Sequence, residues 1–374
     1  MRFLILFVLL TGFFIGPEEI KHPERHFFVR PSFEADTLFR HSVRIDFRDT
    51  IPGDTLRVYT SEDGLIHSCS REINTGVCID GECRRLRMEL YWTVTGRYYG
   101  LILPGGEFLS KTEHVPFKEE DYKKLERVLE NPHSVLGDYA IDELITEGEG
   151  NVDGITAATL AAVKEESVPD AVYTSHTLWH LVYGETQREI QNYARQHLTD
   201  ELALQLIKSA DFEDQLWTLE NMGPALKWTS GLREAVLDKI MREHGILASM
   251  ALSAFPDSIL QESSMQLILT EGFSGMAYIN QRNLLKRLKD GPHLDIQAAR
   301  ILAGKLSSLS AGIIGHVLEV FEAHQLRDER IDGLVVQLLD HDNRFIAGKA
   351  VDYLKTKGIT DKKVLRKIKK TGLS

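Results

Sequence analysis

Asp153, Thr156 and Thr159 follow one another at three-residue steps in the segment NVDGITAATLAAV, residues 151–163. Asp153 could cap a helix that begins near Gly154, because its carboxylate would accept hydrogen bonds from the free amides of the first turn. Thr156 could do the same one turn later, but this leaves the hydroxyl group of Thr159 without a role. Only small residues separate the two threonines, so a second protein could reach that hydroxyl group, as a site of covalent attachment requires.

His176 and His180 in the segment HTLWH are four residues apart, so both can lie on one side of a helix. Such a pair can bind zinc or haem. No third ligand follows at a recognisable spacing, which favours one exposed and one packed histidine. The segment PGGE at 104–107 lacks the Lys-Ser/Thr pair of a P-loop and is expected to form a turn. The chain has no GxSxG motif, so hydrolase chemistry has no support.

The three cysteines of the chain, Cys69, Cys78 and Cys83, lie close together in the sequence. In an exported protein, clustered cysteines indicate a disulfide bond. Cys78 and Cys83 flank the turn-forming pair Asp80-Gly81, and a hairpin there would bring their sulfur atoms together. The sequence therefore predicts a Cys78–Cys83 disulfide, with Cys69 left over. A metal site is the alternative, but no CxxC pair supports it.

The first 16 residues, MRFLILFVLLTGFFIG, have the build of a secretory signal peptide, with a charged start, a short apolar run and small residues near a cut. An uncleaved anchor is the alternative, but the run is shorter than the ~20 apolar residues of a membrane span. We expect an exported protein of the periplasm, cell envelope or extracellular space, with no transmembrane segment after the signal peptide. The net charge of −11 over 374 residues argues against nucleic acid as a partner.

The elements that must position these residues change in kind along the chain. Residues 27 to 115 favour β-structure, and the segment LRMELYWTVTGRYYGLIL predicts a hairpin that turns at Thr95-Gly96. A helical period follows, in which Phe117, Tyr122, Leu125, Val128 and Leu129 share one face. The segments TAATLAAVKEESV and AVYTSHTLWHLVYGETQREIQNYARQHL are also helical in pattern. We therefore expect an α+β domain over residues 27–184.

From residue 185 to residue 374 the pattern is nearly all helix with short polar breaks. Several segments pair a helix end, a polar turn and a new amphipathic helix at intervals of about 40 to 50 residues, a period typical of HEAT or armadillo repeats. An irregular helical bundle is the alternative. Either arrangement would serve as a scaffold or docking surface, and no catalytic constellation is visible in this half.

The segment DGITAAT resembles the Asp-x-x-Ser/Thr-Gly-Ala-Ser/Thr motif of extracytoplasmic FMN-binding domains, found in electron-transport subunits of the Rnf, Nqr and NosR type. In that family a flavin transferase joins FMN to the last hydroxyl residue of the motif through a phosphoester. Asp153 matches the acid, Thr156 the middle hydroxyl residue, Ala158 the alanine and Thr159 the acceptor. Ala157 stands where the family has glycine.

The resemblance extends over roughly residues 70–185 and includes the text around the cysteines, the first helical segment and VPDAVYTSHTLWHLVYGE. It implies an α+β FMN-binding-like domain, followed here by an all-α, HEAT-like helical-repeat domain. Aromatic side chains of this region are candidates by type for contacts with the flavin ring, although most are expected in the core. These candidates are Tyr91, Trp92, Tyr98, Tyr99, Tyr173 and Trp179.

The sequence supports three hypotheses of different classes. The first is a redox carrier with FMN on Thr159, which needs a flavin transferase and passes electrons between partner proteins that bind the helical half; the flavin supplies the redox chemistry. The second is an envelope scaffold that keeps the fold but has lost the flavin through Ala157. The third is a metal-binding protein that uses His176, His180 and the cysteines.

Overall fold

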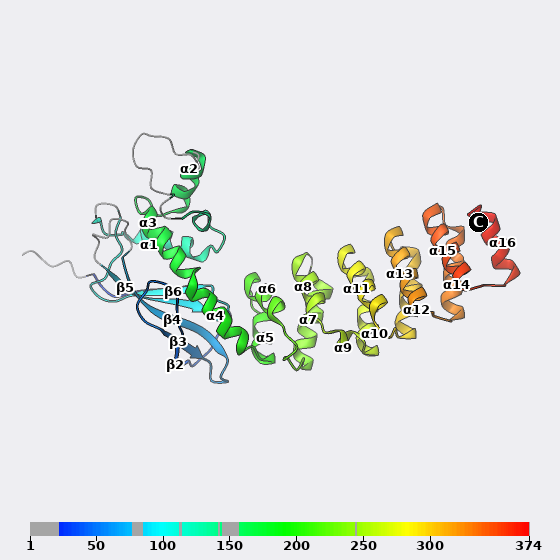
Figure 1. Cartoon of the computed structure of the whole chain (residues 1–374), viewed down its shortest axis with the longest axis horizontal. Coiled ribbons are helices and arrows are strands. Elements are labelled where there is room, and N and C mark those ends of the chain that lie inside the picture. The colour runs from blue at the N-terminus through cyan, green and yellow to red at the C-terminus, as the bar shows by residue number, and fades with distance from the viewer. Residues whose placement is uncertain are drawn as a thin grey trace, which may run out of the picture. The chain divides into compact units, whose positions relative to one another are not determined.

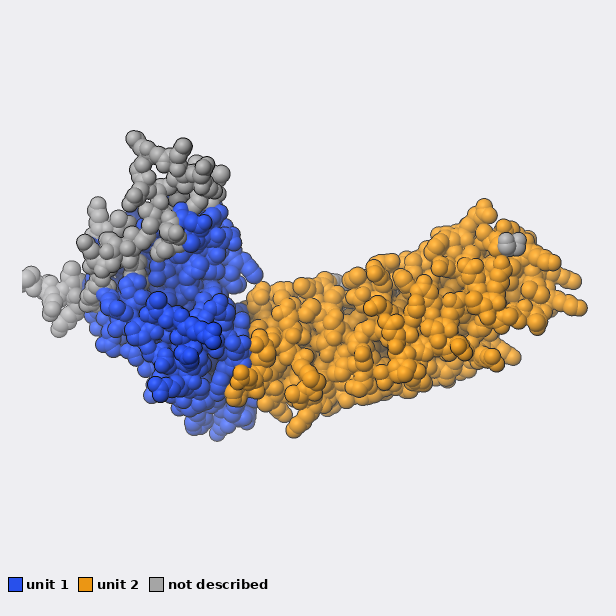
Figure 2. Space-filling model, viewed as in Figure 1, with its two compact units in different colours: residues 1–31, 35–193 blue, residues 32–34, 194–374 orange. Residues whose placement is uncertain are grey.

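A computed structural model of the chain describes residues 22–76, 85–111, 114–140, 143, 157–243 and 245–373, with the backbone only for 157–160. The chain divides into two compact units (Figure 2). Unit 1 comprises residues 1–31 and 35–193, and unit 2 comprises residues 32–34 and 194–374. The boundary expected from the sequence lies after residue 184, where helix α4 (Glu185–Gln196) begins. The first part of α4 belongs to unit 1.

Unit 1 is built on a six-stranded antiparallel sheet with the strand order β1-β6-β5-β4-β3-β2. Strands β2 to β6 form a meander, and β1 returns to pair with β6 at the edge. The strands are β1 (Arg25–Phe28), β2 (Phe39–Arg44), β3 (Thr55–Thr60), β4 (Ile66–Thr75), β5 (Leu86–Thr93) and β6 (Tyr98–Leu103). The α+β layout expected for this half of the chain is confirmed at this level.

The predicted hairpin is present as β5 and β6. Gly96 has φ +82°, the left-handed region that glycine enters without strain. The amide of Gly96 donates to the carbonyl of Thr93, and the amide of Thr93 donates to the carbonyl of Arg97. Alternate residues of β5 are buried, so one face of the sheet carries the core.

Four α-helices of unit 1 are described (Figure 1). They are α1 (Glu119–Glu130), α2 (Ala157–Glu166), α3 (Val172–Val182) and α4 (Glu185–Gln196), and a 3₁₀ turn, η2 (Val135–Asp138), lies between α1 and α2. Helix α1 buries Tyr122, Leu125, Val128 and Leu129, as the helical period predicted. Trp92 of β5 donates to the Val182 carbonyl of α3, Arg71 of β4 donates to the Thr186 hydroxyl group of α4, and α1 packs on β6. Tyr122 stacks on Phe27 of β1, with ring centroids 5.2 Å apart.

Unit 2 consists of short helices that pack in two rows. One row is α5 (Asp200–Ile207), α7 (Ser230–Arg242), α10 (Ser263–Glu271), α12 (Ile296–Lys305) and α14 (Glu329–Gln337), and the other is α6 (Phe212–Asn221), α8 (Ile246–Ala254), α11 (Tyr278–Asp290), α13 (Ala311–Ala323) and α15 (Arg344–Thr356). The remaining described elements are α9 (Asp257–Leu260), α16 (Lys362–Thr371), η4 (Phe273–Gly275), η5 (Leu306–Ser308) and η6 (Leu338–Asp340). None of the described helices is long and apolar enough to cross a membrane.

The helix pairs repeat at a constant interval. From α7 onward, the residues that precede the first-row helices and α16 are Thr229, Glu262, Asp295, Asp328 and Asp361, each 33 residues after the one before. Thr199, which precedes α5, lies 30 residues before Thr229. The interval of 40 to 50 residues expected from the sequence is therefore wrong. It is too long because these helices are short and their connections are tight. All-α structure in this half, expected from the sequence, is confirmed.

Side chains of one repeat bond to the backbone of the preceding repeat. In the second row, Arg287 donates to the carbonyls of Leu252 and Phe255, His324 to that of Leu288, and Lys357 to that of Leu326. Each of these side chains therefore satisfies carbonyl groups at or just beyond the carboxyl end of the preceding helix in the row. One continuous hydrophobic core runs through the unit from Ala203 to Ile368.

Candidate functional site at the start of helix α2

The motif that pointed to covalent attachment leads into helix α2. Asp153 and Thr156 lie outside the described residues. Ala158 and Thr159 lie in the first turn of α2, which begins at Ala157. The first turn of a helix has amides without helical partners and a positive dipole end, a combination that favours a phosphate group. The backbone position of Thr159 is therefore compatible with a phosphoester there.

The other end of α2 is fixed by its last residue. The Glu166 carboxylate accepts hydrogen bonds from the Ser134 hydroxyl group at 2.5 Å and from the Val135 amide at 3.1 Å. These are the residues at which η2 begins, so a charged acceptor caps that turn. On the opposite side, the Lys124 ammonium group of α1 donates to the Glu165 carbonyl at 2.8 Å. Helix α2 is thus tied to both η2 and α1.

The two histidines of α3 hold the segment that leads toward the motif. Because carbonyl oxygens only accept, His176 Nε2 donates to the Tyr139 carbonyl at 2.8 Å, and His180 Nε2 donates to the Leu136 carbonyl at 3.0 Å. Their ring centroids are 4.1 Å apart. Burial lowers the pKa of His176, and its Nδ1 atom is buried without a partner. The lowered pKa keeps the His176 ring neutral, and both rings act as positioning groups through these hydrogen bonds.

The expected split between the two histidines is observed in part, because His176 is buried and His180 is half-buried. Within the described ranges, no group of three His, Cys, Asp or Glu side chains is placed to hold a metal ion. The alternative of a metal site on this pair therefore has no third ligand among the described residues.

Trp179 closes the contact between α3 and η2. Its indole nitrogen donates to the Asn131 carbonyl at 2.9 Å. A Cβ atom at Gly137 would lie 2.5 Å from the Trp179 ring, so glycine lets the turn rest directly on the indole. Trp179, His176 and His180 of α3 therefore all contact η2 or the residue that follows it.

The aromatic candidates for flavin contacts divide into core and partly exposed residues. Trp92, Tyr98 and Trp179 are buried. The Trp92 indole nitrogen donates to the Val182 carbonyl at 2.8 Å, which joins β5 to α3. Tyr91 and Tyr99 are half-buried and pack against Phe28, and Tyr173 is also half-buried. Three of the six residues are therefore core residues, whereas core positions were expected for most of the set.

The cysteines are described only at one position. Cys69 is a free, fully buried thiol on β4, and burial raises its pKa to about 12. A thiol with so high a pKa is neutral and inert at physiological pH. The predicted pair Cys78 and Cys83 lies outside the described residues.

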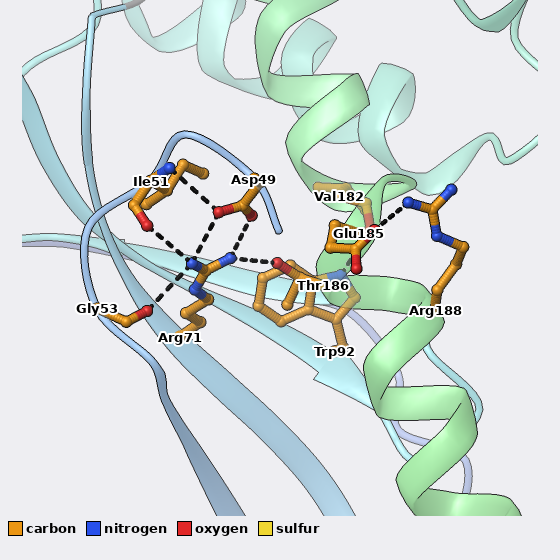
Figure 3. Close-up of polar contacts among 9 residues, drawn as sticks. All are labelled: Asp49, Ile51, Gly53, Arg71, Trp92, Val182, Glu185, Thr186 and Arg188. Atoms are coloured by element: carbon orange, nitrogen blue, oxygen red, sulfur yellow. Dashed lines mark hydrogen bonds and ion pairs between the residues drawn. The ribbon is translucent and has the colours of Figure 1, made fainter. Parts of the chain in front are cut away.

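A buried arginine that sequence reasoning missed, Arg71, forms the centre of a cluster of polar contacts in unit 1 (Figure 3). The Arg71 side chain is 1% exposed, and its guanidinium group makes a bidentate ion pair with Asp49 at 2.5 and 3.0 Å. It also donates to the Thr186 hydroxyl group at 2.9 Å and to the carbonyls of Ile51 and Gly53 at 3.2 and 3.1 Å. One side chain therefore joins β4, the loop before β3 and helix α4.

The period of β4 contains the signal for this residue. Arg71 lies two residues from Cys69 and from Ile73, and in a strand such residues share a face. Both neighbours point into the core, so Arg71 must do so too. A charge on the buried face of a strand requires partners nearby.

An open groove lies beside this centre, between the loop after β2 and the start of α4. It is lined by Ile45, Asp46, Arg48, Glu185, Arg188 and Glu189. Glu185 and Arg188 form an ion pair with each other, one turn apart on α4. The groove has charges of both signs on its walls, so it favours neither anions nor cations.

Comparisons of this chain with protein-family models, with curated proteins and with solved structures found no match.

Proposed function

We propose that this protein is an exported electron-transfer flavoprotein that holds FMN through a phosphoester to the hydroxyl oxygen of Thr159. The observation that carries the proposal is the position of Thr159 in the first turn of α2, inside a segment that resembles the flavin attachment motif. A flavin transferase would form the bond, and the attached flavin would pass electrons between envelope partners.

The surroundings of Thr159 support this role. Ala157 and Ala158, directly before Thr159, are small, and Ala161 follows one residue after Leu160. Small residues on the side of the motif would leave a transferase room to approach the acceptor. The amides of the first turn would donate to the flavin phosphate. Glu166 anchors the opposite end of the helix and takes no part in the attachment site.

The same proposal includes location and partners. Residues 1–16 would direct export, and Cys78 and Cys83 would form a disulfide in the oxidising compartment. The helical repeats of unit 2 would bind the redox partner proteins.

A second function is an envelope scaffold without flavin. Two observations favour it: Ala157 replaces the glycine of the motif, and unit 2 devotes residues 194–374 to a repeat architecture that suits protein binding. In this case the FMN-binding-like fold is retained only as a structural domain.

The test is intact mass and visible absorption of the exported protein after coexpression with a flavin transferase. We expect a mass gain of one FMN with a flavin spectrum in the wild type. Thr159→Ala should abolish both signals, whereas Thr159→Ser keeps a hydroxyl group and should retain them at a reduced level.

Ala157→Gly separates the two functions. A wild type of unmodified mass together with a modified Ala157→Gly variant would show that the extra methyl group blocks attachment, and the scaffold function would then lead. Unmodified mass in both proteins would reject covalent flavin attachment.

A further inference from the structure

Helix α16, the last described element of the chain (Figure 1), has a basic side and an apolar side. Residues three, four and seven apart lie on one side of a helix, so most of its cations gather on one face. Its apolar residues lie opposite, and Ile368 among them is buried in the core of unit 2. The cations therefore point away from the stack of repeats. Those that belong to exposed residues, called the basic face below, are Lys362, Lys363, Arg366, Lys369 and Lys370.

The carboxylates around α16 do not neutralise this face. Residues 355–373 contain eight lysine and arginine residues and a single acidic residue, Asp361, whose carboxylate caps the first-turn amides of α16. The neighbouring turn η6 adds Asp340, which pairs with Lys367 at 2.6 Å, and Asp342 follows in the chain. Among the described residues, no ion pair joins a carboxylate to the five cations of the basic face. In a chain of net charge −11, the basic face is therefore a local concentration of positive charge.

An exposed apolar side chain stands at the border of the basic face. Leu365 is 41% exposed. Lys362 precedes it by three residues and Lys369 follows it by four, so a cation stands on each side of it along the helix. A leucine between two lysines can enter the boundary between lipid headgroups and acyl chains while the ammonium groups stay at the level of the headgroups.

The residue types of the basic face distinguish between its possible partners. Protein interfaces are enriched in aromatic residues and arginine and depleted in lysine, and single-stranded nucleic acids are bound through aromatic rings on which the bases stack. Helix α16 contains no aromatic residue and one arginine, Arg366. Clusters of about four to eight lysine and arginine residues on an amphipathic helix are typical of binding to anionic lipids. The negative potential of such a surface is diffuse, so the point charges of lysine suit it without a fixed geometry.

We propose that the basic face of α16, together with Leu365, binds the surface of a bilayer that contains anionic phospholipids. The lipid phosphate groups attract the five cations, and Leu365 enters the boundary beneath the headgroups. The apolar side of α16 stays packed on unit 2 through Ile368, so the contact is peripheral and the helix lies on the surface. The proposal concerns α16 alone and does not depend on flavin attachment.

The test measures cosedimentation of the full chain with vesicles of phosphatidylcholine, either alone or mixed with phosphatidylglycerol. We expect binding to the mixed vesicles to be tighter by about tenfold or more. Raising the salt concentration from about 0.1 M to about 1 M shortens the Debye length from about 10 Å to about 3 Å and should abolish this preference. The apolar residues 3–14 could also enter a bilayer, but their binding would require neither phosphatidylglycerol nor low salt.

Two double variants of equal charge change test the site. Lys363→Glu with Lys370→Glu should weaken binding to the mixed vesicles by about tenfold or more. Arg282→Glu with Lys286→Glu is the matched control, because both residues are exposed on α11 and the net charge of the chain changes by the same amount. The control should change binding by less than about twofold. Leu365→Ser should weaken binding by about threefold, because it removes the apolar contact and keeps every charge.

Absence of binding, binding that does not depend on phosphatidylglycerol, or equal weakening by the α11 control would overturn the proposal. Tighter binding of a labelled oligonucleotide than of the mixed vesicles, lost in the Lys363→Glu, Lys370→Glu variant, would also overturn it and assign the basic face to nucleic acid. Concentration-dependent self-association that the same variant abolishes would assign the face to a second copy of this chain instead. Circular dichroism of each variant checks the fold, which should persist because all these positions are exposed.

Discussion

Arg71 shows how a single buried charge can organise a domain. Its planar guanidinium group presents several donors in fixed directions, and Asp49, Thr186 and two loop carbonyls match four of them. The Phe47 ring lies 3.7 Å from the guanidinium carbon and covers its face. From its place on β4, the one side chain satisfies partners on the loop before β3 and on α4 at once.

Replacing Arg71 should therefore strongly destabilise unit 1. Arg71→Met removes the donors but leaves Asp49 and the loop carbonyls in place, so we expect a loss of about 3–5 kcal/mol in the free energy of unfolding. Urea denaturation measures it. Arg188→Met is the control, because Arg188 is exposed on α4 and its ion pair with Glu185 should contribute nothing measurable. Equal midpoints for the two variants would show that other contacts hold the loop.

At the level of elements, residues at helix starts connect one repeat to the next. The Asp328 carboxylate accepts from the amides of Arg330 and Ile331 at the start of α14, and from the Arg300 guanidinium group of α12 at 2.6 and 3.1 Å. One carboxylate therefore caps a helix and binds the preceding repeat. The hydrogen bond from Arg300, together with the amide bonds, lowers the pKa of Asp328.

The depressed pKa of Asp328 predicts a pH dependence of stability. The folded state holds the carboxylate ionised, so its contribution is complete above the unfolded pKa of about 3.9 and is lost as pH falls through the lower folded value. Asp328→Asn keeps a capping oxygen but removes the charge, so its stability should fall less than that of the wild type between pH 5 and pH 3. Thermal unfolding across this range measures the difference.

Asp361 is the matched control for this prediction. It caps α16 at the equivalent repeat position, and hydrogen bonds from the amides of Lys363 and Val364 lower its pKa, with no arginine among the causes. Asp361→Asn should change the pH dependence less than Asp328→Asn does. The reverse order would mean that the bond to Arg300 contributes little.

Local patterns predicted the elements that local chemistry determines. The apolar period over residues 117–129 predicted α1, and the turn at Gly96 predicted the β5–β6 hairpin. The helical stretch from Ala171 was expected without a break, but the structure divides it into α3 and α4. A Cβ atom at Gly184, in the break, would lie 2.4 Å from the His180 carbonyl oxygen, a contact that no helical period reveals.

Features that depend on contacts between distant residues could not be predicted from local sequence patterns. The 33-residue interval is carried by residues as different as Thr229, Glu262 and Asp295, which share a place before a helix rather than an identity. The attachment motif was found as a string of letters. The contacts that hold the surrounding segments could not be predicted from the sequence, because they join distant residues. The Glu166 carboxylate bonds to Ser134, and the His176 ring bonds to the Tyr139 carbonyl.

On the scale of the whole molecule, unit 2 is a linear stack. Each helix pair packs mainly on its neighbours, so local stability depends on how many neighbours a pair has. Helix α16 packs on η6, and Ile368 is its only buried side chain. It therefore ends the described stack with the smallest apolar contact of the first-row helices.

Hydrogen exchange should show this gradient. Amides of α16 should exchange at least ten times faster than those of α11 and α13, which have packed neighbours on both sides. Mass spectrometry of peptides after deuterium labelling gives the rates. Ile368→Ala should accelerate exchange in α16 and leave α11 unchanged. Uniform rates through unit 2 would instead indicate a single cooperative unit.

Because the interval is constant, whole repeats could be removed from unit 2 or added to it without a change in how neighbouring repeats contact one another. The Gln266 side chain donates to the carbonyl of His293 and accepts from the amide of Asp295, so both of these hydrogen bonds join it to backbone atoms of the next repeat. Removing residues 295–327 would bring Asp328 to the place of Asp295, with the same backbone groups and the same capping carboxylate in front of Gln266. Loss or duplication of one such segment would change the length of unit 2 by one repeat. The new junction would keep the same hydrogen bonds between a glutamine side chain and backbone groups.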